Sequence, residues 1–193
     1  MSVTIKSLLQ LPSLNGARVV AGEKGLNKVV SSISVLEYFD PGVLQDALFQ
    51  NDEFYGSEIV ITGFIQVKND VNAQCSTVRR LADGGEVGLI MFYVGIFMPA
   101  VDPRLIRLAD ELNFTLICMP ENRIDLRYSE VIREVMEAIF RDQMVATYLV
   151  SEMLERISLL PDHQRSMDTV LKMLRDMLAC SFVILDSRLA VVN

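Results

Sequence analysis

Residues 86–120 read EVGLIMFYVGIFMPAVDPRLIRLADELNFTLICMP, two apolar runs that flank one amphipathic segment. The runs at 86–95 and 113–120 are almost continuously apolar, which is typical of parallel strands covered on both faces. Between them, Asp102 is a predicted helix N-cap and Pro103 occupies the first turn. The stretch therefore predicts a strand, a helix and a second, parallel strand. The apolar residues expected on the inner face of this helix are Leu105, Leu108, Ala109 and Leu112.

Upstream of this unit, the alternation of apolar runs and amphipathic segments continues. Residues 29–37 and 57–64 are two further predicted strands, and the second is again almost entirely apolar. A helix is predicted over residues 71–85, ending at Gly84 and Gly85, which together are a typical helix stop. Strands and helices that alternate in this way predict an α/β protein, with a mostly parallel, Rossmann-like sheet flanked by helices.

A different pattern begins at residue 125. Residues 125–160 contain neither Gly nor Pro, and apolar residues recur at three- and four-residue steps. As one helix this span would be roughly 50 Å long, which is too long for an ordinary compact domain. We expect a connecting helix that pairs with a symmetry mate as a short coiled coil; the alternative is a helix that breaks near Asp142 and folds back. The predicted dimerisation residues are Ile132, Val135, Ile139, Ala146, Leu149 and Met153.

The last part of the chain starts a new pattern after Pro161, which ends the long helix. A further amphipathic helix is predicted over residues 166–180, and two short apolar strands over 181–193. We interpret this part as a truncated α+β segment, because a lone hairpin is only marginally stable. The expected domains are an α/β domain at residues 1–122, a linker and dimerisation helix at 123–161, and the incomplete segment at 166–193.

The composition argues against several classes of function. The 193 residues carry a formal charge of −7, which disfavours a DNA- or RNA-binding surface within them. Three widely spaced cysteines and one histidine predict neither a zinc site nor a disulfide framework, so we expect no metal and no cofactor. The longest apolar run, residues 87–101, is too short for a membrane helix, and no signal pattern opens the chain. We expect a soluble, cytoplasmic protein without membrane contact.

Catalytic constellations are scarce in this sequence. The motifs of nucleotide-binding loops, serine hydrolases and zinc proteases are all missing from it. His163 is interpreted as an exposed loop histidine. Glu37 and Asp40 are one candidate acid–base pair; the alternative is that Asp40, which precedes Pro41, belongs to a turn and helix cap. A small enzyme would need a nucleophile and a base close in space, and the sequence motifs indicate no such pair. We therefore expect that the chain is not an enzyme.

Small and polar residues follow the predicted strands. In open α/β sheets, ligands bind beyond the carboxyl ends of the strands, at a switch point in the strand order. Free backbone amides and polar side chains at these ends can line a small-molecule pocket. The alternative is turn chemistry alone, in which Gly63 and Gly95 only allow positive φ. The candidate ligand-binding residues are Glu37, Thr62, Gly63, Gly95, Pro120, Glu121 and Asn122.

Three stretches occur in an order that points to a family: SISVLEYFDP at 32–41, SEIVITGF at 57–64, and the whole run of residues 78–120. Together they resemble the N-terminal domain of the purine catabolism regulator (PucR) family of bacterial transcription factors. The opening residues are similar to the start of that family as well, so that the resemblance covers residues 3–122. The matching positions are Val19, Val20, Gly22, Gly25, Leu26, Thr62, Gly63, Gly88, Leu89, Pro99, Ala109, Leu116, Ile117 and Pro120.

The resemblance implies a bacterial regulator that senses a metabolite. Family members carry a GAF-like region and a C-terminal helix-turn-helix after this domain, and residues 166–193 resemble the start of the GAF-like region. The helix-turn-helix is missing from the sequence, so we expect DNA contact only through that absent domain. The stretch at 42–58 is longer than is usual in the family, which affects any pocket that it borders.

Two functions follow from these expectations. The first is an effector-sensing and dimerising part of a transcriptional regulator, with a homodimer partner and a small-molecule effector from purine degradation or related nitrogen metabolism. The second is a structural or oligomerisation module that binds no ligand. Ligand binding and the oligomeric state would distinguish the two.

Overall fold

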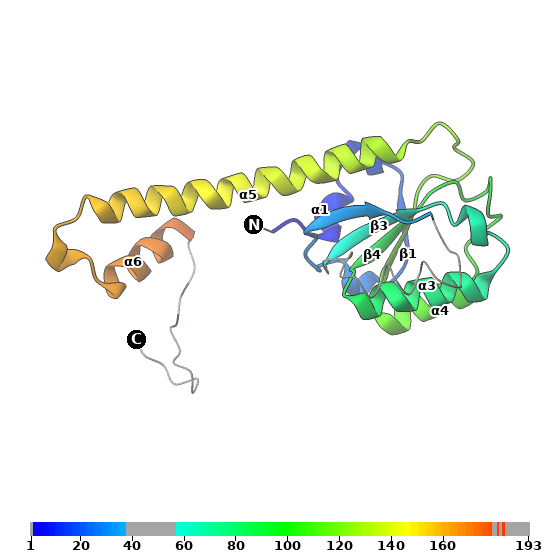
Figure 1. The fold of residues 1–193 in the computed structure, drawn as a ribbon, viewed down its shortest axis with the longest axis horizontal. Coiled ribbons are helices and arrows are strands. Elements are labelled where there is room, and N and C mark those ends of the chain that lie inside the picture. The colour runs from blue at the N-terminus through cyan, green and yellow to red at the C-terminus, as the bar shows by residue number, and fades with distance from the viewer. Residues whose placement is uncertain (1, 38–56, 179–180, 182, 184–193) are drawn as a thin grey trace. The chain divides into compact units, whose positions relative to one another are not determined.

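The computed structural model describes residues 2–37, 57–178, 181 and 183 (Figure 1). The chain divides into two units, Met1–Asp142 and Gln143–Asn193. The predicted residues Asp40 and Cys180, and nearly all of the hairpin predicted at 181–193, lie outside the described residues.

The first unit is built on a five-stranded sheet with the strand order β1-β5-β4-β3-β2. Strands β2 to β5 run parallel, whereas β1 pairs antiparallel with β5. The predicted α/β class and the mostly parallel sheet are therefore confirmed. The bounds of the strands are Arg18–Ala21 (β1), Ser32–Val35 (β2), Glu58–Thr62 (β3), Gly88–Met91 (β4) and Thr115–Cys118 (β5).

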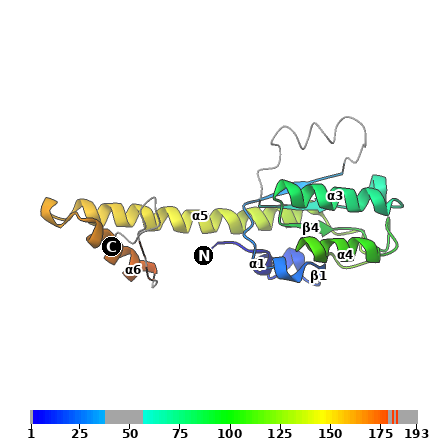
Figure 2. The ribbon, with the colours of Figure 1, turned by 90° about the horizontal axis from the view of Figure 1, so that it is seen from below.

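The order of the parallel strands differs from the expectation in one respect. Strands β2 to β5 lie side by side in chain order, so that these strands have no reversal and no switch point among them. Right-handed crossovers then put their connecting helices on one face of the sheet. Helices α3 (Val71–Gly84) and α4 (Pro103–Leu112) lie next to each other there (Figure 2).

The predicted Asp102 cap and the predicted glycine stop of the first crossover helix are both observed, and Asp70 is an additional cap. The Asp70 side chain accepts a hydrogen bond from the Ala73 amide at the start of α3, and Asp102 caps α4 in front of Pro103. Helix α3 ends at Gly85, where φ is +95°, and α4 ends at Asn113. The inner faces bury an apolar layer against the sheet, which includes Val78, Leu81, Leu105, Leu108 and Ala109.

The opposite face of the sheet is covered by elements from the two ends of the unit. These are α1 (Ile5–Leu8), the short turn η1 (Pro12–Leu14) and the first half of α5 (Tyr128–Ser158). A second short turn, η2 (Glu23–Gly25), follows β1. Val131, Val135 and Ile139 of α5 are buried there with Ile5 and Leu8 of α1. The compact unit therefore continues to Asp142, beyond the domain boundary predicted at residue 122.

This packing bears on three of the predicted dimerisation residues. Val135 and Ile139 are 0% and 4% exposed, and Ile132 is partly buried against the same core. The side chains of Val135 and Ile139 are thus used within the chain's own domain. A partner helix could reach them only if α5 left the sheet.

Helix α5 passes Asp142 without a break and ends at Ser158, so that the alternative of a break near Asp142 is not observed. In the second unit, η4 (Asp162–Gln164) and α6 (Met167–Leu178) follow it, close to the predicted helix at 166–180. Leu149 and Met153 are partly buried there, whereas Met144 and Tyr148 are 73% and 66% exposed. In the described part of the chain, every helix is too short or too polar to cross a bilayer.

Candidate functional site

The predicted site residues gather at one edge of the sheet because they follow parallel strands. Glu37 comes after β2, Gly63 after β3, Gly95 after β4 and Asn122 after β5. Parallel pairing of these four strands brings their carboxyl ends to the same edge. The expected gathering of these positions along the sheet is thus present in the fold.

Glu37 is at the centre of a small hydrogen-bonded cluster at this edge. Its Oε1 atom accepts a hydrogen bond of 2.7 Å from the Gly63 amide and one of 2.6 Å from the Tyr128 hydroxyl. Its Oε2 atom is buried and has no hydrogen-bond partner. One oxygen therefore takes two donors, and the other is an unused acceptor.

Gly63 allows this close approach. A Cβ atom at this position would lie 3.0 Å from the Tyr128 hydroxyl oxygen and 3.4 Å from the Tyr93 ring. A larger residue would therefore press against the Tyr128 hydroxyl and against the Ile65 side chain, which would be 3.2 Å away. Thr62 has a different role, because it is fully buried and its hydroxyl accepts from the Phe64 amide at 3.0 Å. The Thr62 side chain therefore stabilises the turn after β3, as the turn alternative predicted.

Two tyrosines complete the cluster. The ring centroids of Tyr93 and Tyr128 are 5.7 Å apart, and Phe92 packs edge-on against Tyr128. The Tyr93 hydroxyl donates a hydrogen bond of 3.0 Å to the Leu126 carbonyl. Burial, then the Glu37 hydrogen bond and charge, raise the pKa of Tyr128 well above its usual value. Tyr128 is therefore a fixed, neutral hydrogen-bond donor.

Sequence reasoning missed both tyrosines as site residues. Tyr93 lies two positions before Gly95 at the end of an apolar run, and Tyr128 matches the apolar spacing of the long helix. A helical pattern cannot separate a tyrosine that fills a core from one that also bonds a carboxylate. One signal in the sequence was available: Tyr128 places a hydroxyl at the start of the long helix, directly after the last predicted strand and its polar residues.

Gly95 and Asn122 form a second contact at the same edge. Gly95 has a φ of +85°, and a Cβ atom there would lie 2.5 Å from the Asn122 side-chain oxygen. The Asn122 amide donates a hydrogen bond of 2.9 Å to the Val94 carbonyl. Two predicted residues are thus adjacent, and the glycine leaves the room that the asparagine occupies.

The remaining two predicted residues lie toward strand β1 and the residues before it. Glu121 accepts a hydrogen bond of 2.5 Å from the Arg18 guanidinium, and both side chains are exposed. Pro120 lies beside Gly16, where a Cβ atom would be 3.3 Å from the Pro120 ring. The contacts of Glu121 and Pro120 are thus with residues other than Glu37 and Gly63.

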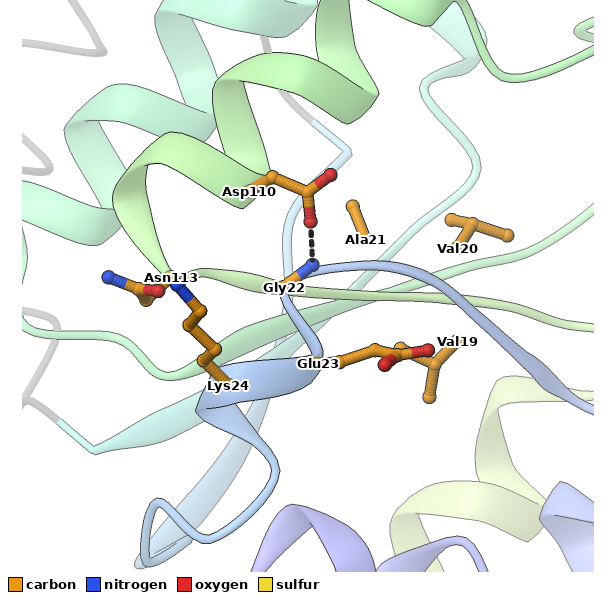
Figure 3. Close-up of a pocket in the computed structure, with 8 residues that line it drawn as sticks. All are labelled: Val19, Val20, Ala21, Gly22, Glu23, Lys24, Asp110 and Asn113. Carbon is orange, nitrogen blue, oxygen red and sulfur yellow. Dashed lines mark hydrogen bonds between the residues drawn. The ribbon is translucent and has the colours of Figure 1, made fainter.

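A cavity of about 410 Å³ lies at the other edge of the sheet, beside the start of β5 (Figure 3). Its lining residues are Val19, Val20, Ala21, Gly22, Glu23, Lys24, Asp110 and Asn113. The Gly22 amide donates a hydrogen bond of 2.6 Å to Asp110, and the Gly22 carbonyl accepts one of 3.0 Å from Thr115. The cavity thus contains none of the predicted site residues.

Two buried glutamates also lie at this other edge. Glu58 starts β3, Glu86 precedes β4, and they are 5% and 2% exposed. One oxygen of Glu58 and both of Glu86 are buried without a hydrogen-bond partner. Burial raises the pKa of Glu86, and the charge of Glu58 raises it further. The described residues contain no cluster of three or more acidic, histidine or cysteine side chains that could hold a metal ion.

Together, the fold and the Glu37 cluster define a class of protein: an α/β domain, covered by helices on both faces, with a polar cluster at the carboxyl ends of its parallel strands. A sequence model of the purine catabolism regulatory protein-like family matches residues 7–139, and the chain belongs to that family. The family suggests a domain of a transcription regulator. The match ends at Ile139, a buried residue in the first half of α5. Neither the curated proteins nor the solved structures gave a significant match.

Proposed function

We propose that residues 2–142 form the effector-sensing part of a bacterial transcriptional regulator, and that α5 connects it to the rest of the protein. The observation that carries this proposal is the hydrogen bond of 2.6 Å from Tyr128 to Glu37. It joins the end of β2 to the first turn of α5. A ligand that changes the surroundings of Glu37 would act directly on this helix.

Such coupling needs a ligand with different affinities for two arrangements of the protein. The Glu37 carboxylate is suited to this coupling. One of its oxygen atoms accepts hydrogen bonds both from the Gly63 amide, which follows β3, and from the Tyr128 hydroxyl of α5. A competing donor on that carboxylate would weaken the contact with the helix. The effector class that the family resemblance implies is a metabolite of purine degradation or related nitrogen metabolism.

A regulatory role fits the chemistry of the cluster better than catalysis does. In the described residues, Glu37 has no bond to a cysteine, a serine hydroxyl or a histidine that could serve as its nucleophile or base partner. His163, the one histidine, is exposed in η4 of the second unit. We therefore propose a binding domain that is not an enzyme and needs no cofactor.

We also propose that the second half of α5 forms a homodimer contact. Met144 and Tyr148 lie four residues apart, on one face of the helix, and both are mostly exposed. Of the predicted residues, Leu149 and Met153 lie on another face and are partly buried in the second unit. The more exposed face offers the larger apolar area to a partner, so we expect the contact there. DNA contact would belong to the helix-turn-helix that the resemblance implies.

Ligand screening tests the sensing role. Purine-degradation intermediates, sugar acids and amino acids are added to the chain, and melting temperature, heat of binding and sedimentation are measured. We expect at least one of these metabolites to bind and to change the dimerisation constant. If no metabolite binds and the chain still dimerises, the ligand-free oligomerisation module is the better explanation.

Variants of α5 test the dimer contact. Met144→Glu with Tyr148→Glu is expected to weaken dimerisation by about tenfold or more, because it puts charge in an apolar contact. The matched control is Leu149→Glu with Met153→Glu on the other face. If only the control variant becomes monomeric in sedimentation, the contact lies on the face predicted from the sequence. A monomeric wild-type chain at high concentration would contradict both versions.

A further inference from the structure

We propose that the outer edge of β1 and the cavity beside it bind an extended peptide segment that carries a basic side chain. The peptide adds a strand to the sheet alongside β1 and places a lysine or arginine between Glu23 and Asp110, which both line the cavity. The cavity contains no residue of the Glu37 cluster, so this inference does not depend on the proposed sensing function.

The backbone of β1 is the first argument. In the part of the chain that the structure describes, β1 is the last strand of the sheet and pairs with β5 alone. An edge strand presents backbone N–H and C=O groups on its outer side, where another strand can pair with them. The register also shifts between Val19 and Ala21, so that Val20 has no partner residue on β5. The four residues of β1 can pair with about 13 Å of extended chain.

The shape of the cavity is the second argument. One wall is a continuous stretch of chain, residues 19–24, and the other is the end of α4 with Asp110 and Asn113 (Figure 3). Val19 and Val20 are only partly buried, so they offer apolar surface to a guest. A volume of about 410 Å³ is in the usual range of ligand sites. A groove between an edge strand and a helix suits a peptide that pairs through its main chain and places alternate side chains in the pocket.

The third argument is charge. Two carboxylates, Glu23 and Asp110, and one ammonium group, Lys24, line the cavity, so its charge is negative. The Lys24 side chain lies beside Asn113, whereas Glu23 extends on the other side, toward Val19 (Figure 3). Within the described residues, the exposed Glu23 carboxylate has no hydrogen bond or ion pair. A basic side chain complements this lining and the formal charge of −7 of the whole chain, whereas an acidic one is repelled.

Calorimetry on the full chain with three blocked peptides tests the proposed class. The probes are acetyl-Thr-Val-Lys-Val-Thr-amide, the same peptide with Glu in place of Lys, and the Lys peptide with N-methylated valines. We expect the Lys peptide to bind, the Glu peptide to bind at least about fivefold more weakly, and the N-methylated peptide at least about tenfold more weakly, because it lacks main-chain donors. No binding of the Lys peptide at millimolar concentration overturns the proposal. Equal binding of the N-methylated peptide overturns it as well, since the site then recognises a compact cation.

Charge variants of the lining locate the binding. Glu23→Gln should weaken the Lys peptide by about threefold, and Lys24→Gln should tighten it by a similar factor, as expected for exposed charges. Both side chains are exposed, and effects of opposite sign cannot both come from lost stability. The control is Glu111→Gln, next to Asp110 in α4 but not part of the lining, which should leave the affinity unchanged. If Glu23→Gln and Lys24→Gln also leave it unchanged, the peptide binds elsewhere and the proposal is wrong.

Amide hydrogen exchange identifies the strand that receives the peptide. With saturating Lys peptide, we expect at least one amide of Arg18–Ala21 to exchange at least about tenfold more slowly, because a new strand accepts its hydrogen bond. The amides of Ser32–Val35, in the strand at the opposite end of the sheet order, should not change. Protection at β2 and not at β1 contradicts the proposal. If the peptide instead competes with self-association of the chain in sedimentation, this edge is an interface between two copies, and the peptide assignment fails.

Discussion

The two edges of the sheet bury carboxylates in opposite ways. At the carboxyl edge, Glu37 accepts two hydrogen bonds on one oxygen and contacts the first turn of α5. At the amino edge, both oxygens of Glu86 are buried and unpartnered, and Glu58 adds a like charge. The difference shows that burial alone does not identify a functional carboxylate. A donor that belongs to a helix leading out of the domain sets Glu37 apart.

The largest expected effect concerns a glycine at the amino edge. Gly22 has a φ of +70°, and a Cβ atom there would lie 2.1 Å from the Phe114 carbonyl oxygen. We expect Gly22→Ala to lower the free energy of unfolding by about 3 kcal/mol or more, because the clash is with backbone that cannot rotate away. Urea denaturation measures the change. A loss below about 1 kcal/mol would mean that β5 shifts easily at this edge.

The next effect tests the hydrogen bond that distinguishes the carboxyl edge. Tyr128→Phe removes the donor of the 2.6 Å bond to Glu37. A hydrogen bond to a charged group contributes about 1.5–3 kcal/mol, and we expect a loss of unfolding free energy in that range. Tyr148→Phe is the matched control, since Tyr148 is 66% exposed and the variant keeps the ring that the proposed dimer contact uses, and it should be neutral. Equal effects of the two variants would remove the distinction between the edges.

A smaller loss is expected for the second glycine of the carboxyl edge. Gly95 has a φ of +85°, and the atom that a Cβ would meet, at 2.5 Å, belongs to the Asn122 side chain. This side chain can rotate, so we expect Gly95→Ala to cost about 1–2 kcal/mol, mainly from the backbone conformation. The double variant with Asn122→Ala separates the two terms in denaturation experiments. If it recovers all of the loss, the clash and not the positive φ is responsible.

The smallest effect has the opposite sign and concerns Glu86. Burial raises its pKa above the usual value of 4.5, so the folded chain binds the proton more tightly than the unfolded chain. Its contribution is therefore favourable below that pH and is lost as the pH rises through the raised pKa. We expect Glu86→Gln to increase the unfolding free energy at pH 7 by about 1 kcal/mol, and to flatten the decline of stability above about pH 4.5.

Denaturation curves across this pH range check the sign. Glu111→Gln, on the exposed side of α4, is the control and should leave the pH dependence unchanged. A loss of stability in Glu86→Gln at neutral pH would show that the glutamate has a favourable partner. The two edges would then be alike.

The sequence predicted the secondary elements better than their arrangement. Apolar runs and helix caps located four strands and the helices between them, because buried parallel strands and capped helices have strong local signals. Strand β1 was missed, since RVVA is a short edge strand with one buried residue, Ala21. The sequential order of β2 to β5 was also not predicted, because local patterns do not encode which strands become neighbours.

The candidate site was predicted in part for the same reason. Glu37 and Gly63 were named as strand ends, and they are joined by a hydrogen bond of 2.7 Å. Their partner Tyr128 comes from a helix 91 positions further along the chain, and its role depends on how that helix packs. The burial of Val135 and Ile139 within the domain could not be predicted either. The same apolar spacing is expected for a helix face in a core and for one in a dimer contact.

One face of the sheet is covered by elements from both ends of the domain, and this has a consequence for folding during synthesis. The parallel strands can add one after another as they leave the ribosome, since each crossover is local in sequence. The layer under α1 is different, because Ile5 and Leu8 from the start of the chain share it with Val131 and Val135. Until α5 has emerged, that layer is exposed to water and to neighbouring chains, so this domain cannot complete its folding before its outgoing helix exists.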